Sequence, residues 1–256
     1  MDIHSIVTSE KESGLLIPDF YRQDANLAKL RLSLAVDRYV KLPGLFSGDV
    51  LGALKGELEA LQEDSKNKNF TMPGYETPRI MTTLSGQVIR SKSDLLKAIY
   101  KDTELRKLID TLVGRPVYDC LDVNEWMIAT ILNAPGNTHG WHLDDPPLAM
   151  VVFVDAPTAD DGGLVEFIRD WPRLCAEIGV DPNGEVNSIV EQCRAAGLIE
   201  QKHHSAGDAY LFRADECLHR VTPLLRAGAR RAILNLTFEL VPNVYRQGYT
   251  VGLLVD

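Results

Sequence analysis

Three side chains of types that bind metal ions stand out in this sequence: His142, Asp144 and His219. His142 and Asp144 are two residues apart, so on a β-strand both side chains point to the same side and can bind one ion. His219 comes from a later segment and can complete the set. Two imidazoles and one carboxylate that leave the remaining coordination positions open are typical of a non-haem iron site.

The segments around these residues are predicted to be turns and strands. Residues 133–140 are rich in Gly, Pro and Asn, which indicates a turn or loop that delivers the pair. Apolar and β-branched runs predict strands at residues 148–154, 164–168, 207–212 and 232–239. His219 follows the third of these strands, and Arg230 and Arg231 precede the fourth.

This order of parts resembles the Fe(II)/2-oxoglutarate dioxygenases. In that superfamily a double-stranded β-helix, or jelly roll, carries His-x-Asp on one strand, a distal His on a later strand, and an Arg shortly after it. The resemblance implies Fe(II) as the metal, with 2-oxoglutarate and O2 as co-substrates. The Arg would pair with the far carboxylate of 2-oxoglutarate, which needs a bidentate, permanently charged partner inside an apolar barrel. Arg230, eleven residues after His219, is the expected partner, and Arg231 is the alternate.

Further polar residues resemble one branch of this superfamily, the lysine-type hydroxylases and radical halogenases that act on free amino acids. The positions that surround the substrate in that branch correspond here to Arg79, Glu125, His139, Asp145, Asn235 and Thr237. A basic amino acid brings one carboxylate and two ammonium groups into a partly dry pocket, where each needs an opposite charge or a hydrogen-bond partner. Arg79 suits the carboxylate, and Glu125 and Asp145 suit the ammonium groups.

Asp144 decides which reaction the resemblance implies. Halogenases of this branch have Gly at that position, which frees a coordination site for chloride. With Asp144 present, we expect a hydroxylase that attacks an unactivated C–H bond, with L-lysine as the substrate and succinate and CO2 as co-products. One departure lies near the C-terminus, where members of the branch close the pocket with a Trp. No Trp follows Trp171 here, and Tyr245 or Tyr249 is the expected substitute.

Three other functions are compatible with these residues. A dioxygenase that acts on another small molecule, or on a carrier-bound amino acid, would keep the iron site and change the pocket. A catalytically inactive jelly-roll binding protein would keep only the fold. A hydrolytic zinc site also uses two His and one carboxylate, although the chain has no His-Glu-x-x-His motif to support it.

Composition restricts the partners. The formal net charge of −9 disfavours nucleic acid and anionic membranes as partners. A free amino acid is the small-molecule partner that the resemblance implies. Four cysteines form no Cys-x-x-Cys pair, so reduced thiols and a cytoplasmic location are expected. No signal peptide or membrane span is expected either, because no stretch reaches the 18 or so apolar residues that a span needs. A homodimer remains open.

The expected architecture is β-rich α+β, with a jelly-roll core that N-terminal helices buttress. A chain of 256 residues suits a single domain: mainly helical support over 1–115, the jelly-roll core over 116–240 with a helical insertion at 169–204, and a C-terminal tail over 241–256. Apolar spacing predicts helices at 25–39, at 50–62 with Ser47 as N-cap, and at 92–112.

Residues 65–70 are interpreted as a polar break, residues 77–88 as an extended or looped segment, and strands are expected to begin near Val117. The insertion is expected to contain helices at 172–178 and 186–196. It is interpreted as a lid over the open end of the barrel, or else as a surface appendage or dimer contact.

Overall fold

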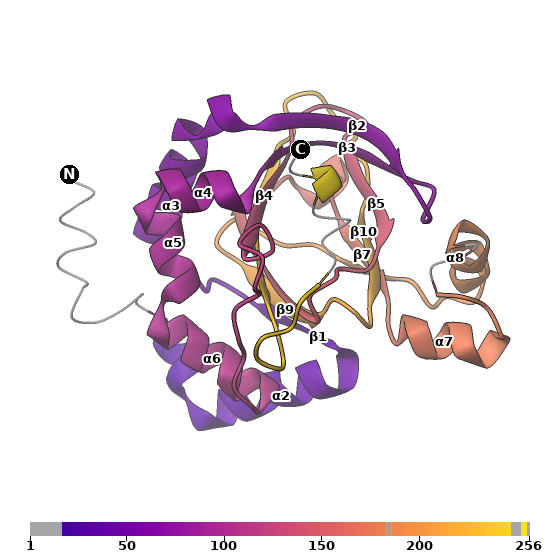
Figure 1. The fold of residues 1–256 in the computed structure, drawn as a ribbon, viewed down its shortest axis with the longest axis horizontal. Helices are drawn as coiled ribbons and strands as arrows, with labels where there is room; N and C mark the ends of the chain where they lie inside the picture. The colour runs from indigo at the N-terminus through magenta and orange to yellow at the C-terminus, as the bar shows by residue number, and fades with distance from the viewer. Residues whose placement is uncertain (1–16, 183, 185, 247–251, 255–256) are drawn as a thin grey trace.

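A curled, antiparallel, 11-stranded sheet forms the centre of the computed structural model, which describes residues 17–182, 184, 186–246 and 252–254 (Figure 1). Its strands are β1 (Tyr39–Leu42), β2 (Lys66–Met72), β3 (Thr77–Leu84), β4 (Met127–Leu132), β5 (Thr138–His142), β6 (Leu148–Asp155), β7 (Val165–Ile168), β8 (Glu200–Lys202), β9 (Ala209–Arg213), β10 (Leu218–Val221) and β11 (Arg231–Phe238). Ten strands follow the order β1-β9-β6-β11-β4-β3-β5-β10-β7-β8, and β2 pairs with β3 outside this path. The predicted β-rich α+β class is confirmed.

Central strands of the sheet are buried on both faces. In β6, Ala149, Val151 and Phe153 pack inside the curl of the sheet, whereas Leu148, Met150, Val152 and Val154 pack in the cluster that also contains the helices. Since side chains alternate along a strand, this two-sided burial explains the continuous apolar run in the sequence. The same alternation in β11 directs Ile233 inward and Leu234 outward.

Helices of the first half cover the outer face of the sheet (Figure 1). They are α2 (Asp24–Asp37), α3 (Gly48–Ala60), α4 (Gly86–Lys92), α5 (Asp94–Lys101) and α6 (Thr103–Val113). Ser47 caps α3 as predicted, accepting from Val50 N at 3.5 Å. The continuous helix expected over 92–112 is wrong, because Ser93 and Asp102 act as N-caps and divide it into α5 and α6.

Strands begin earlier than the sequence predicted. The strand β1 pairs with β9, and β2 pairs with β3 over seven residue pairs, so residues 65–70 are not a polar break. The strand β2 is polar because it lies at an edge with most of its side chains exposed or half-buried. The extended interpretation of residues 77–88 is confirmed in its first part by β3, while α4 occupies the remainder.

The predicted insertion contains α7 (Trp171–Ile178) and α8 (Val186–Ala195), which lie together at one side of the barrel (Figure 1). Their apolar faces pack on Trp141 and Leu143, next to the predicted metal ligands. Short 3₁₀ turns occur at Asp19–Arg22, Gln62–Asp64 and Ala159–Asp161. None of the helices in the described part of the chain is long and apolar enough to cross a bilayer.

Candidate metal centre and substrate cavity

The three predicted metal ligands converge inside the barrel. The Nε2 atoms of His142 and His219 lie 3.5 and 3.8 Å from Oδ1 of Asp144, and one ligand atom from each residue lies within 4.8 Å of the other two. Both histidines are buried, and the Asp144 side chain is 16% exposed. Oδ2 of Asp144 is buried without a hydrogen-bond partner. An orphaned carboxylate oxygen beside two imidazole nitrogens fits a divalent metal ion.

A β-bulge brings His139 and His142 to the same side of β5. In the antiparallel pairing with β10, His142 opposes His219 and His139 opposes Val221, so three steps on β5 match two steps on β10. The extra residue lets two side chains of opposite parity face the interior. Gly140 lies inside this bulge, where a Cβ atom would come within 2.7 Å of Thr77 Cβ and 2.8 Å of Pro78 O. The β3 strand therefore packs closely only because residue 140 is glycine.

Main-chain carbonyls orient both histidines. Nδ1 of His142 lies 2.7 Å from Gly140 O, and Nδ1 of His219 lies 2.9 Å from Cys217 O. Donation from Nδ1 to these carbonyls leaves Nε2 deprotonated and available as a ligand. Burial lowers the pKa of both histidines and raises the pKa of Asp144. The neutral imidazoles are in the form that a metal ion requires.

A cavity opens beside these ligands. Its wall contains His142, Asp144 and His219 together with Glu125, Ile128, Thr130, His139, Asp145, Pro146, Val151, Tyr210, Phe212, Val221, Arg231, Ile233, Asn235, Thr237 and Leu254. Five of the six residues predicted to bind substrate are in this set, and Arg79 is not. The described residues of the 169–204 insertion do not line it either. The position of α7 and α8 supports a buttress for β5 and β10 rather than a lid.

Arg231, and not Arg230, lines the cavity. The side chain of Arg230 is 30% exposed and pairs with Asp155 at 3.0 Å, so the preference for Arg230 has no support in the geometry. Arg231 is 2% exposed, has a buried Nε without a partner, and stacks over Phe153 at 4.9 Å. Burial lowers its pKa to about 10. A buried guanidinium with no carboxylate partner in the described part of the chain suits an anionic ligand.

Strand alternation explains the difference between the two arginines. Arg231, Ile233, Asn235 and Thr237 share one parity in β11 and all line the cavity. Arg230 precedes the strand with the opposite parity and points to the surface pair with Asp155. The prediction that Asn235 and Thr237 share a face could therefore have selected Arg231 from the sequence.

Two further carboxyl groups face the cavity from the loops. Glu125 is 8% exposed, and its Oε1 is buried without a partner. Burial, followed by the charges of Asp145 and Asp144, raises the pKa of Glu125 to about 8. Burial and the charge of Asp144 also raise the pKa of Asp145. The accumulation of acidic groups in a dry cavity favours a cationic ligand.

Neutral polar groups complete the wall. Burial raises the pKa of Asp144, and a contact with the side chain of Asn235 opposes this rise, while Oδ1 of Asn235 has no partner. Thr237 Oγ1 donates to the carbonyl oxygen of Glu125, which ties β11 to the loop before β4. His139 stacks on His142 with ring centroids 3.9 Å apart, and its Nε2 is buried without a partner.

Arg79 lies behind the cavity wall. It pairs in register with His139 and is fully buried, and it donates to Thr77 Oγ1 at 3.0 Å and Pro78 O at 3.1 Å. Its Nε has no partner, and burial lowers its pKa to about 10, partly offset by Tyr75 and Asp144. These contacts hold the guanidinium behind the wall that contains the metal ligands, and Arg79 itself does not line the cavity.

The C-terminal segment contributes a residue that the sequence did not single out. Leu254 lines the cavity, and its carbonyl oxygen accepts from Thr83 Oγ1 at 2.7 Å. Tyr245 is 83% exposed and does not line the cavity, so it does not replace the expected Trp in this structure. Tyr249 lies outside the described residues. Tyr210 was also missed, although it shares its inward parity with Phe212 in β9.

Comparisons with known proteins identify the family and the fold. A family model described as Halogenase D matches residues 21–249. The comparison with curated proteins gave no match. Among solved structures, the chain is similar to the epimerase SnoN in complex with Fe3+, alpha ketoglutarate and nogalamycin RO, with a TM-score of 0.65, 14% identity, and coverage of 85% of this chain and 84% of that chain.

Two further structures have a similar fold. A Pseudomonas putida prolyl-4-hydroxylase aligns with a TM-score of 0.54 and 16% identity over 83% of this chain and 98% of that chain. An oxidoreductase of the 2OG-Fe(II) oxygenase family from Burkholderia pseudomallei aligns with a TM-score of 0.59 and 11% identity over 85% and 92% of the two chains. At these identities the likeness establishes the fold, and the predicted jelly roll is confirmed.

Proposed function

Because the chain belongs to the Halogenase D family and has the fold of the 2-oxoglutarate/Fe(II) oxygenases, we propose that it hydroxylates a free basic amino acid, with L-lysine as the expected substrate. The observation that carries this proposal is the convergence of His142, Asp144 and His219 in a cavity that also contains two carboxyl groups and a buried guanidinium whose Nε has no hydrogen-bond partner. Bound Fe(II) and 2-oxoglutarate would supply the oxidation, in which O2 adds one oxygen atom to the substrate and one to succinate, and CO2 leaves.

Different residues of the cavity suit the metal ion and 2-oxoglutarate. His142, Asp144 and His219 would hold the metal through Nε2, a carboxylate oxygen and Nε2. Arg231 would bind the far carboxylate of 2-oxoglutarate, since it is buried, its Nε has no hydrogen-bond partner, and no carboxylate of the described residues pairs with it. Pairing this carboxylate with the guanidinium removes the cost of a buried, unpaired charge.

The acidic groups give the cavity its selectivity for a cationic substrate. We propose that Glu125 and Asp145 bind ammonium groups, with Asn235, Thr237 and His139 as neutral partners. An ammonium beside Glu125 would stabilise its carboxylate and oppose the rise of its pKa to about 8. Arg79 would act on the substrate carboxylate only after a side-chain movement, because it does not line the cavity as it stands. Otherwise its role is to support Asp144 electrostatically.

Asp144 favours hydroxylation over halogenation. Its carboxylate occupies the position that chloride needs in the halogenases that the chain resembles. A contact with the side chain of Asn235 stabilises the ionised form of Asp144, which is the form that binds a metal. Halogenation is the second candidate, since the family description names it.

We propose that the chain forms a single catalytic domain, because strands from both the N-terminal third and the core join one sheet. A cytoplasmic location is supported by four free, buried cysteines.

Turnover with a panel of free amino acids tests the substrate proposal. The protein is loaded anaerobically with Fe(II) and 2-oxoglutarate, mixed with lysine, ornithine, arginine, glutamine or leucine, and exposed to O2. We expect a 16-dalton gain on a basic amino acid, together with succinate. The variant Glu125→Gln should lose most of this activity, because it removes the negative charge and keeps the shape. Equal turnover of leucine and lysine would contradict the acidic pocket.

A further inference from the structure

The loop between β9 and β10, residues 214–217, supplies carbonyl groups to two of the three proposed metal ligands. Ala214 O accepts the main-chain N–H of Asp144 at 3.1 Å, and Cys217 O lies 2.9 Å from Nδ1 of His219. The third ligand is oriented within its own strand by Gly140. The relative orientation of Asp144 and His219 therefore depends on where this loop lies.

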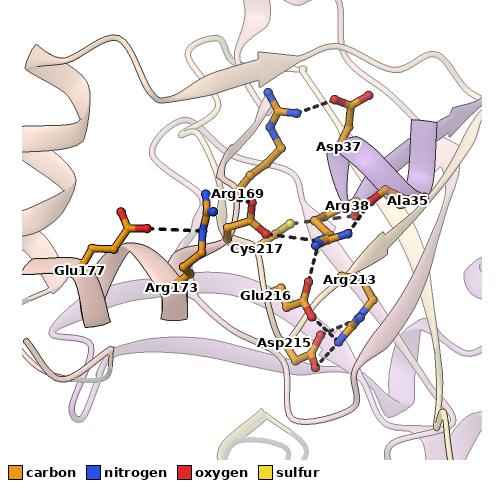
Figure 2. Close-up of polar contacts among 11 residues, drawn as sticks. Ala35, Asp37, Arg38, Arg169, Arg173, Glu177, Arg213, Asp215, Glu216 and Cys217 are labelled. Carbon is orange, nitrogen blue, oxygen red and sulfur yellow. Dashed lines mark hydrogen bonds and ion pairs between the residues drawn. The ribbon is translucent and has the colours of Figure 1, made fainter. Parts of the chain in front are cut away.

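A group of ion pairs fixes this loop from outside the barrel (Figure 2). Nε and Nη2 of Arg213 donate to the two carboxylate oxygens of Asp215, both at 3.0 Å, and Nη2 lies 2.6 Å from Glu216. The other carboxylate oxygen of Glu216 lies 2.8 Å from Nε of Arg38, which is also 3.3 Å from Asp170. Both acidic residues of the loop are thus held by arginines.

Main-chain hydrogen bonds link the same groups. Arg213 N donates to Arg38 O at 2.8 Å, and Trp171 N donates to Glu216 O at 2.8 Å. Arg38 has a left-handed backbone with φ of 59° at the end of α2, and so places its carbonyl and its guanidinium on the loop together. The loop is consequently attached to Arg38, which follows α2, and to Trp171 at the start of α7.

We propose that Arg213 and Arg38 are positioning residues for the metal centre. Their ion pairs with Asp215 and Glu216 hold the 214–217 loop at the distance from which Ala214 and Cys217 orient Asp144 and His219. This role rests on the metal site of the proposed function, and it means that residues outside the barrel help to orient the ligands of that site. Groups that contact metal ligands directly, as the carbonyls of Ala214 and Cys217 do, commonly change metal affinity by about 10- to 100-fold when they are lost. Arg213 and Arg38 act on the ligands through these carbonyls.

Because these ion pairs are partly exposed, their loss should affect metal affinity and the free energy of unfolding differently. The side chains of Arg38 and Arg213 are 35% and 27% exposed, and such pairs contribute little to the free energy of unfolding. Loss of Arg213 should therefore alter metal binding much more than folding. A lysine at this position would restore the charge but not the bidentate contact with Asp215, so it should rescue metal binding only in part.

Titration of the metal-free protein with Co(II), followed by visible absorption, tests this role without turnover. We expect Arg213→Gln to weaken Co(II) binding about 10-fold and to change the absorption spectrum of the bound ion. Glu216→Gln should act in the same direction. The matched control is Arg169→Gln, because Arg169 is 37% exposed and its ion pairs, with Asp37 and Glu200 at 2.5 Å, involve neither acidic residue of the loop. The control should bind Co(II) like the parent protein.

Two outcomes would overturn the proposal. One is unchanged Co(II) affinity and spectrum in both Arg213→Gln and Glu216→Gln. The other is an equal loss in Arg169→Gln, which would mean that any damage to this surface has the same effect. Failure of the parent protein itself to bind Co(II) would instead refute the proposed metal site, so the two failures are distinguishable.

Discussion

Replacement of Arg231 by Gln should weaken the binding of 2-oxoglutarate far more than the same change at Arg230. Arg231 is 2% exposed and lines the cavity, whereas the Arg230 side chain is 30% exposed and already paired with Asp155. Truncation of one partner in a buried, charge-assisted pair costs about 2–5 kcal/mol. At about 1.4 kcal/mol per factor of ten, this cost corresponds to roughly 30- to 4,000-fold weaker binding.

The expected effect at Arg230 is much smaller. Loss of a partly exposed pair such as Arg230–Asp155 costs between about zero and 1 kcal/mol of stability and does not touch the cavity. Binding of 2-oxoglutarate by Arg230→Gln should thus stay within about threefold of the parent. Isothermal titration calorimetry with the Mn(II)-loaded protein under argon measures both affinities directly.

A stability measurement guards against simple unfolding of the Arg231 variant. Burial lowers the pKa of Arg231 to about 10, so the charged guanidinium is unfavourable in the folded protein without a bound anion. Arg231→Gln should accordingly unfold at the same or a higher urea concentration than the parent. The reasoning is refuted if Arg231→Gln binds 2-oxoglutarate within threefold of the parent, or if Arg230→Gln shows the larger loss.

Three further predictions concern the metal ligands and the cavity. Asp144→Gly should reduce hydroxylation by at least about 100-fold and weaken Mn(II) binding. Turnover in the presence of chloride, followed by mass spectrometry, also shows whether chlorination replaces hydroxylation. Hydroxylation at the parent rate would show that Asp144 is not a metal ligand. Gly140→Ala should lower stability by about 1–3 kcal/mol in urea unfolding, because its Cβ would lie 2.7 Å from Thr77 Cβ, and an unchanged midpoint would refute the close approach of β3. The pKa of Glu125 is raised to about 8 in the folded protein, so the stability that its protonated form contributes is present at low pH and is lost as pH rises through about 8. Between pH 6 and pH 9, the metal-free Glu125→Gln variant should therefore lose less free energy of unfolding than the metal-free parent. Equal losses in the two proteins would show that Glu125 is not buried as described.

Much of the barrel could be predicted because successive side chains along a strand point to opposite faces of the sheet, which leaves a pattern in the sequence. The apolar run of β6 is a local signal, and it located the strand that follows His142 and Asp144. The turn predicted over 133–140 is too long, because β5 already begins at Thr138. The preference for Arg230 over the alternate Arg231 followed spacing from His219, whereas parity within β11 favours Arg231. Parity is the more reliable guide, since a shift of one residue turns a side chain to the other face.

Other features depend on contacts that the local sequence does not contain. The strand β2 is polar and forms only because β3 offers it an edge. The inward position of both His139 and His142 requires a bulge, which is set by the pairing with β10. Leu254 reaches the cavity from the C-terminus, and Arg38 reaches the 214–217 loop from α2. Such long-range contacts appear only when the sheet is assembled.

The most direct test of the proposed function is a single turnover under ¹⁸O₂. The protein is loaded with Fe(II), 2-oxoglutarate and L-lysine without oxygen, and is then mixed with the labelled gas in the presence of chloride. A hydroxylase of the proposed type gives one ¹⁸O atom in succinate and a labelled hydroxyl group on lysine. A chlorinated lysine would contradict the role assigned to Asp144, and the absence of labelled succinate would contradict the metal centre itself.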